Sequence, residues 1–265
     1  MPKTRLDQAL VERGLLPTRA KAQAAVIAGA VRVDGARATK PATTVTDDAH
    51  IEVDQPPKYV SRGGDKLEGA LIDTGLEVTG ADALDLGAST GGFTDCLLKH
   101  GADRVIAVDV GYGQLAWPLR NDPRVTVMER TNARHLQPDD LPYPPNLIVC
   151  DVAFISIATI WPAAARCAAP GFTALMMVKP QFEVGKGLVG SGGVVRDPRL
   201  HHDAIMHVAD AIQADRGVIT MVAASRLTGP KGNREFFVLV RDAATEIGGI
   251  DVAAAAEHAV EVGPE

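Results

Sequence analysis

The chain has 265 residues, of which 46% are hydrophobic, and a formal net charge of −6. This length and composition suit a soluble globular protein with one large domain and a second, smaller one. The opening MPKTRLDQALVERG is charged throughout and no run of 18 apolar residues occurs, so we expect neither a secretion signal nor a membrane span. The three cysteines show no CxxC pairing, which predicts reduced thiols, no metal site and a cytoplasmic location.

Charge is spread unevenly along the chain. Residues 1–40 carry eight Lys or Arg and three acids, a net charge of +5, which leaves −11 for the remainder. Such asymmetry favours a basic RNA-reading module joined to an acidic enzyme.

The first 55 residues predict a small α+β domain. Apolar residues at helical spacing predict a helix over 5–13, and Thr18 caps a second helix that ends near Gly29. Short strands are expected at 31–33 and 51–53, with a tight turn at Asp34-Gly35 after the first of them. Pro56-Pro57 then begins a stiff linker over 56–63.

This segment resembles an S4 RNA-binding domain through RLDQALVERGL, TRAKAQAAVIAGAVRVDG and the Lys40-Pro41 step. In that family two helices and the following turn present basic side chains to structured RNA. The resemblance implies RNA contacts for Arg5, Arg19, Lys21, Arg32 and Lys40. The alternative is a helical cap that merely packs against the next domain.

From residue 58 onward, apolar strands alternate with helices, as in a parallel sheet covered on both faces. We expect strands at 82–86, 104–109, 124–128, 146–151, 172–178, 217–224 and 235–241, and helices near 64–74, 92–100, 155–168 and 198–213. The loop at 228–234 is too short for a helical crossover, so the last two strands should be antiparallel. The pattern predicts a doubly wound, Rossmann-like class I methyltransferase fold with a seven-stranded sheet over residues 64–265.

A glycine-rich loop follows the first of these strands, where open sheets bind ligands. The loop reads GASTGG rather than the GxGxxG of nicotinamide sites, and we assign cofactor contacts to Gly87, Ser89, Thr90, Gly91 and Gly92. Asp109 ends the next strand and is placed to bind ribose hydroxyls. Asn132, after the third strand, is our choice for the adenine edge.

Four charged residues of alternating sign occupy positions where such a sheet concentrates chemistry, namely Lys66, Asp151, Lys179 and Glu235. Here the chain resembles the FtsJ-like RNA ribose methyltransferases and, within them, the S4-linked TlyA family, also called haemolysins. The matching segments are SRGGDKL, LDLGASTGGFTD, VDVGYGQLAW, ERTNAR, CDVAFIS, VKPQFEVGKG, GGVVRD and GPKGNREFF.

The resemblance implies a Lys-Asp-Lys-Glu catalytic tetrad and S-adenosylmethionine as cofactor. A ribose hydroxyl is a poor nucleophile until its proton can leave, and an ammonium near the oxygen stabilises developing alkoxide. We assign Lys179 to activating the 2′-oxygen, Asp151 and Glu235 to orienting it, and Lys66 to positioning the ribose and its phosphate. Either lysine remains a candidate for the group that takes the proton.

The expected substrate is RNA. Base methyltransferases carry an Asn/Asp-Pro-Pro-Tyr motif after the fourth strand, but this slot reads Asp151-Val-Ala-Phe154, which favours the ribose and its 2′-hydroxyl. The resemblance implies cytidine 2′-O-methylation in 16S rRNA, 23S rRNA or both, with ribosomal RNA or subunits as partner and a monomeric enzyme. Matching family segments add RNA contacts at Arg62, Arg130, Arg134 and Lys186.

Three other classes of function compete with this interpretation. The haemolysin name raises a membrane-active protein, but no apolar span or cationic amphipathic helix supports one. A non-catalytic RNA-binding scaffold is disfavoured by the intact tetrad. A small-molecule methyltransferase is disfavoured by the basic N-terminal segment.

Overall fold

The computed structural model describes residues 3–54, 57–245 and 247–264, and the chain divides into two compact units, Met1–Pro57 and Lys58–Glu265. Pro56, in the expected linker, lies outside the described residues.

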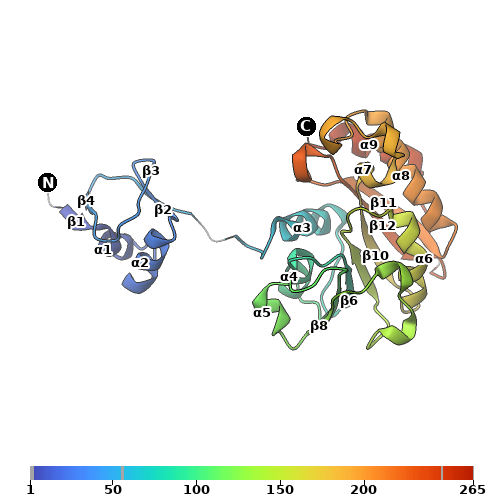
Figure 1. Cartoon of the computed structure of the whole chain (residues 1–265), viewed down its shortest axis with the longest axis horizontal. Helices are drawn as coiled ribbons and strands as arrows, with labels where there is room; N and C mark the ends of the chain where they lie inside the picture. Colours follow the sequence, from blue (N-terminus) through green and yellow to red (C-terminus); the bar gives the residue numbers. More distant parts are fainter. Residues whose placement is uncertain (1–2, 55–56, 246, 265) are drawn as a thin grey trace. The chain divides into compact units, whose positions relative to one another are not determined.

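The first unit packs two short helices against short strands (Figure 1). Its elements are β1 (Lys3–Arg5), α1 (Leu6–Glu12), α2 (Arg19–Ile27), β2 (Val31–Val33), β3 (Ala36–Arg37), β4 (Thr44–Thr46) and β5 (Ile51–Val53). The Thr18 hydroxyl accepts a hydrogen bond from the backbone N–H of Lys21, which caps α2 as the sequence predicts. Leu6, Leu10, Val26 and other apolar side chains form one buried core.

Two antiparallel ladders hold the strands of this unit. β3, β2 and β5 form one sheet, and Asp34 and Gly35 both take positive φ in the turn between β2 and β3. β1 pairs with β4 in a second ladder that sequence analysis did not anticipate. Three residues per strand are too few for an alternating pattern to be recognised.

The second unit contains a seven-stranded sheet in the order β11-β12-β10-β9-β6-β7-β8. The strands are β6 (Asp82–Leu86), β7 (Arg104–Val108), β8 (Val125–Met128), β9 (Leu147–Cys150), β10 (Thr173–Val178), β11 (Gly217–Ala224) and β12 (Phe236–Asp242). The five from β6 to β10 pair in parallel, and β12 lies antiparallel between β10 and β11. The predicted doubly wound fold and its antiparallel final pair are confirmed.

Helices cover both faces of this sheet (Figure 1). One face packs against α3 (Arg62–Thr74), α4 (Gly92–Lys99) and α5 (Trp117–Arg120). The other packs against α6 (Ile157–Cys167), α8 (Pro198–Gln213) and α9 (Val252–Val262). The short α7 (Pro180–Glu183) follows β10, and 3₁₀ turns occur at Ala133–His135, Pro138–Asp140, Lys186–Leu188, Ser191–Gly193 and Pro230–Gly232. Both apolar faces are thereby buried, as a parallel sheet requires.

Candidate active site

The topology brings the predicted catalytic and cofactor residues to one edge of the sheet. The glycine loop, Asp109, Asp151 and Lys179 each follow the carboxyl end of a parallel strand. Glu235 reaches the same edge from the opposite direction, because β12 is antiparallel to β10 and the two strands pair Val178 with Phe236. Residues separated by up to 169 positions therefore meet where open α/β sheets bind ligands.

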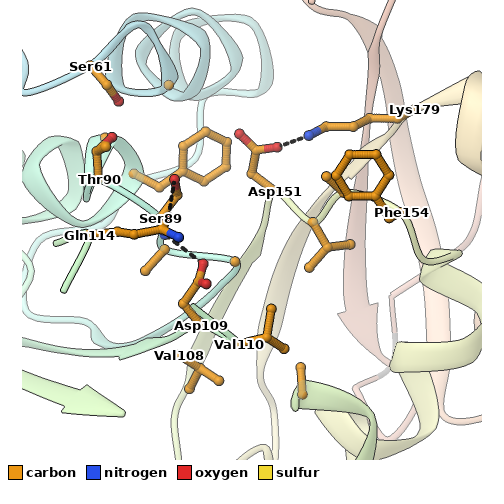
Figure 2. Close-up of a pocket in the computed structure, with 18 of the residues that line it drawn as sticks. Ser61, Ser89, Thr90, Val108, Asp109, Val110, Gln114, Asp151, Phe154 and Lys179 are labelled. Carbon is orange, nitrogen blue, oxygen red and sulfur yellow. Dashed lines mark hydrogen bonds and ion pairs between the residues drawn. The ribbon is translucent and has the colours of Figure 1, made fainter. Parts of the chain in front are cut away.

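A cavity of about 700 Å³ opens at this edge. Figure 2 shows side chains from several loops converging on it. Its lining combines the glycine loop with Asp109, Gln114, Asn132, Lys66, Asp151 and Lys179, and with the backbone around Ser61–Gly63 and Thr228–Pro230. The volume suits a nucleoside-sized ligand together with a reacting group of a second molecule.

The glycine loop is a tight cradle at two of its glycines. Gly87 has φ +84°, and a Cβ there would lie 2.5 Å from the carbonyl oxygen of Asp151. Gly91 has φ +97°, and its Cβ would lie 2.3 Å from the Leu119 side chain. A larger residue at either position would have both a strained backbone and a collision, so the loop can pack against Asp151 and Leu119 in this conformation only with glycine.

Asp109 is fixed beside this loop by two backbone N–H groups. Its carboxylate accepts a hydrogen bond from Ser89 N at 2.8 Å (Figure 2) and another from Gly111 N at 2.6 Å. A carboxylate has lone pairs to spare for further donors, such as the hydroxyls of a ribose. Asn132 also lines the cavity, and its Oδ1 accepts from Arg134 N at 3.1 Å, which leaves the amide NH₂ for another acceptor.

The four predicted catalytic residues form two ion pairs. Lys179 pairs with Asp151 (Figure 2), and Lys66 pairs with Glu235 at 2.5 Å. The Lys66 side chain is 9% exposed and the Glu235 side chain is 0% exposed, so the second pair is almost completely removed from solvent. Removal of either member of this pair would leave the other charge buried and uncompensated.

Glu235 occupies a different position from its three partners. Lys66, Asp151 and Lys179 line the cavity, whereas Glu235 lies behind Gly229, where a Cβ would be 2.2 Å from Glu235 Oε1. Our sequence analysis assigned Glu235 to orienting the 2′-oxygen together with Asp151. In the structure Glu235 contacts Lys66 instead, so its influence on the cavity passes through that lysine.

A further carboxylate lies in the sheet below the glycine loop. Asp85 is completely buried, and its Oδ2 accepts a hydrogen bond from the Thr94 hydroxyl at 2.6 Å. Burial raises the pKa of Asp85 to about 7, the Thr94 hydrogen bond opposes this rise, and the negative charge of Asp151 adds to it. Sequence analysis did not select Asp85, because its position inside a strand gave no sign of a special environment.

Sequence analysis also missed the aromatic group at the mouth of the cavity. Phe154 is 91% exposed, has φ +66° and lies beside Asp151 and Lys179 in Figure 2. Its ring contacts Phe182 with the centroids 5.2 Å apart. A bulky residue with positive φ is an outlier that often marks a functional site, but the sequence alone does not reveal backbone angles.

The candidate RNA-binding residues differ in how they are held. In the first unit, Arg5 and Arg19 both bond to Asp7, Arg32 lies 3.6 Å from Asp54, and Lys21 and Lys40 are exposed. This unit retains cationic side chains at its surface.

In the second unit, Arg62 lines the cavity and donates to the carbonyl of Thr228 at 3.1 Å. Arg130 stacks on the ring of Tyr112 at 4.1 Å, and Arg134 is exposed in the following 3₁₀ turn. The side chain of Lys186 lies outside the described part of the structure.

Over residues 3–54, 57–245 and 247–264, no group of three or more His, Cys, Asp or Glu side chains could hold a metal ion. Within the same ranges, each helix is too short or too polar to cross a membrane.

Comparison with known proteins identifies the family. An FtsJ-like methyltransferase model matches residues 59–242, and an S4 domain model matches residues 4–51. The 16S/23S rRNA (cytidine-2'-O)-methyltransferase TlyA of Mycobacterium tuberculosis is 50% identical over 90% of each chain. Hemolysin A of Brachyspira hyodysenteriae is 41% identical over 88% of this chain and 97% of its own.

Solved structures agree with this assignment. A hemolysin candidate from Streptococcus thermophilus superposes with a TM-score of 0.74 at 38% identity, covering 98% of this chain and 95% of that one. An S-adenosylmethionine-dependent methyltransferase from Mesorhizobium loti, at 18% identity and a TM-score of 0.50, shares the fold over 65% of this chain and 95% of its own. The chain therefore belongs to the FtsJ-like methyltransferases and, within them, to the TlyA family, and it carries an S4 domain before the methyltransferase domain.

Proposed function

We propose that this enzyme transfers a methyl group from S-adenosylmethionine to the 2′-hydroxyl of a cytidine in 16S rRNA, 23S rRNA or both. The observation that carries the proposal is the pair of lysine–carboxylate contacts in one cavity with the glycine cradle and Asp109. The Mycobacterium tuberculosis relative, at 50% identity, is named for this reaction.

The cradle fits S-adenosylmethionine by its chemistry. Asp109 would accept hydrogen bonds from the ribose hydroxyls of the cofactor, and Asn132 would meet the adenine edge. Gly87, Ser89, Thr90 and Gly92 line the cavity and would contact the methionine part, whereas Gly91 lies outside the lining and serves the conformation of the loop. The cofactor supplies a methyl group on a positively charged sulfur, which leaves with the electrons of the broken carbon–sulfur bond.

The residues of the chain then prepare the ribose oxygen. Asp151 holds the ammonium of Lys179 at the cavity wall, where it stabilises the negative charge that develops on the 2′-oxygen as the hydroxyl proton is lost to solvent water and the oxygen bonds to the methyl carbon. Glu235 holds Lys66 in the same way, and Lys66 positions the ribose and its phosphate. Methyl transfer is further accelerated because the 2′-oxygen is held in a fixed orientation toward the methyl group.

The exposed ring of Phe154 offers a stacking surface to the base of the target nucleotide. Single-stranded or extruded bases are commonly read by stacking on aromatic side chains, and this ring stands at the mouth of the cavity next to Asp151. The basic residues of the first unit and Arg62, Arg130, Arg134 and Lys186 would contact the surrounding phosphates. An enzyme with this substrate works in the cytoplasm, and we propose that it acts there as a monomer.

The test is methyl transfer to isolated 30S and 50S subunits and to deproteinised 16S and 23S rRNA, with methyl-labelled S-adenosylmethionine. Nucleoside analysis by mass spectrometry should find the label in 2′-O-methylcytidine. Label on a base nitrogen or carbon would contradict the proposal, and so would cofactor binding without transfer to any of the four substrates. A Lys179→Ala variant run in parallel identifies transfer by a contaminating enzyme.

A further inference from the structure

Among the described residues of the first unit, one charged side chain is completely buried, and the S4 resemblance assigns it no role. Asp7 in α1 has 0% side-chain exposure. Its Oδ2 accepts hydrogen bonds from Arg5 Nη2 at 2.9 Å, Arg19 Nε at 3.0 Å and Gln23 Nε2 at 2.8 Å. Its Oδ1 accepts from Arg5 Nε at 3.0 Å, which makes the Arg5 contact bidentate.

Two guanidinium groups therefore converge on one carboxylate oxygen. Placed side by side without it, these like charges would repel each other. The Arg5 hydrogen bonds are the main reason that the pKa of Asp7 lies far below its usual range, so the carboxylate stays ionised at neutral pH. With two cations and one anion, the cluster keeps a net positive charge.

Both arginines still face solvent with part of their donors. The Arg5 and Arg19 side chains are 42% and 55% exposed, while the anion that orients them is inaccessible. A guanidinium has five N–H donors, and the contacts to Asp7 use two from Arg5 and one from Arg19. The remaining donors belong to planar groups whose orientation is already fixed, which lowers the entropic cost of binding an oxyanion.

We propose that Asp7 is a positioning residue that presets Arg5 and Arg19 as a two-arginine clamp for RNA phosphate. The inference rests on the proposed function, because it takes RNA as the ligand of the first unit. The two arginines then bind RNA through their fixed orientation as well as through their positive charge. Asp7 itself touches no RNA.

Charge and geometry predict opposite effects for one substitution, Asp7→Asn. Removal of a negative charge raises the net charge of the unit, and on charge alone RNA would bind more tightly. Loss of the clamp releases both guanidinium groups, and RNA should bind about tenfold more weakly, with a shallower dependence on salt. Asp54→Asn is the matched control, because it makes the same change in charge and frees Arg32 from a half-exposed contact of 3.6 Å.

Binding of the full-length protein to deproteinised 16S and 23S rRNA would be measured between 50 and 300 mM KCl, below the melting temperature of each variant. We expect weaker binding for Asp7→Asn and equal or tighter binding for Asp54→Asn. Arg19→Lys keeps the charge but lacks the planar fork, so it should also weaken binding while leaving the fold intact. With excess cofactor, Asp7→Asn should raise the KM for RNA and leave kcat unchanged.

Two results would overturn the inference. One is a folded Asp7→Asn variant that binds rRNA as tightly as wild type or more tightly. The other is Arg19→Lys that cannot be distinguished from wild type. If wild type binds and methylates rRNA and these variants match it, the clamp proposal is wrong but the proposed function stands. If wild type neither binds nor methylates rRNA, the proposed function fails together with the clamp.

Discussion

Lys66 and Glu235 come from helix α3 and from the residue before strand β12, yet their side chains meet at 2.5 Å in an almost solvent-free position. Only the lysine reaches the cavity. The carboxylate therefore holds in place a cation that faces the cavity, and these two different positions have measurable consequences.

Glu235→Gln should preserve the shape of this contact while removing its charge. We expect the rate of single-turnover methyl transfer to fall about 100-fold, because Lys66 loses the anion that holds it. Since Glu235 does not line the cavity, the affinity for S-adenosylmethionine measured by calorimetry should stay within about twofold of wild type. Glu235→Ala should also lower the free energy of unfolding by about 3–5 kcal/mol. A fully active Glu235→Gln enzyme would exclude this role.

Phe154 allows function and stability to be separated at one position. Its side chain is 91% exposed and its φ is +66°, so glycine should relieve backbone strain and stabilise the fold by about 1 kcal/mol. Alanine shares the unfavourable φ and should give no such gain. Both variants lose the ring, and loss of a stacked base should raise the KM for RNA about 5- to 100-fold.

The comparison needs melting curves and steady-state kinetics with varied RNA. Phe154→Tyr serves as the control, because it retains the aromatic surface and should retain activity. Normal RNA kinetics in the glycine variant would show that the ring does not contact the substrate.

Asp85 should make stability depend on pH. Its folded pKa of about 7 lies above the ordinary value of 3.8, so the fold favours the protonated form. This contribution is fully present below about pH 4 and is lost as the pH rises through about 7. The gap between the two pKa values corresponds to about 4 kcal/mol.

Asp85→Asn cannot ionise, so its stability relative to wild type should increase between pH 5 and pH 8. Urea unfolding at several pH values measures this difference directly. An unchanged difference across that range would show that Asp85 titrates normally in the folded protein.

Glu183 joins the two loops that carry Asp151 and Lys179. Its carboxylate accepts hydrogen bonds from the Ser156 hydroxyl at 2.5 Å and from Ile157 N at 2.9 Å. Burial raises the pKa of Glu183, and both hydrogen bonds oppose that rise. Glu183→Ala and Ser156→Ala should each slow methyl transfer. The double variant should raise the activation free energy of transfer by about 1 kcal/mol less than the sum of the two single increases.

A stability loss alone would not produce this pattern. Asp197→Ala removes the side-chain cap of α8, which accepts a hydrogen bond from Arg199 N at 2.9 Å, and should cost about 1 kcal/mol of stability. At temperatures where all variants are folded, Asp197→Ala should transfer methyl groups at the wild-type rate. Additive effects of Glu183→Ala and Ser156→Ala would contradict a shared role.

The large elements of the fold could be predicted because apolar periodicity persists over many residues. Strand β6 was expected at 82–86 and is found there, and the antiparallel arrangement of β11 and β12 followed from the short loop between them. The four-residue helices α5 and α7 were not expected, since a single turn leaves too little pattern.

The partners of the charged residues could not be read from the sequence. Nothing local indicates that Glu235 contacts Lys66 rather than Lys179, because the choice depends on the strand order that brings β12 beside β10. The burial of Asp7 between two arginines is likewise a property of packing, and the sequence showed only an acid within a basic segment. The residue types of the site were therefore predictable, whereas their connections required the structure.

The most direct test of the account compares wild type with Lys179→Ala in single-turnover methyl transfer to rRNA, with S-adenosylmethionine affinity measured on the same preparations. We predict that Lys179→Ala binds the cofactor within about twofold of wild type and that 2′-O-methylcytidine formation falls about 1,000-fold or more. Transfer by Lys179→Ala at a rate near that of wild type would contradict the assignment of this cavity as the site where the ribose oxygen is activated.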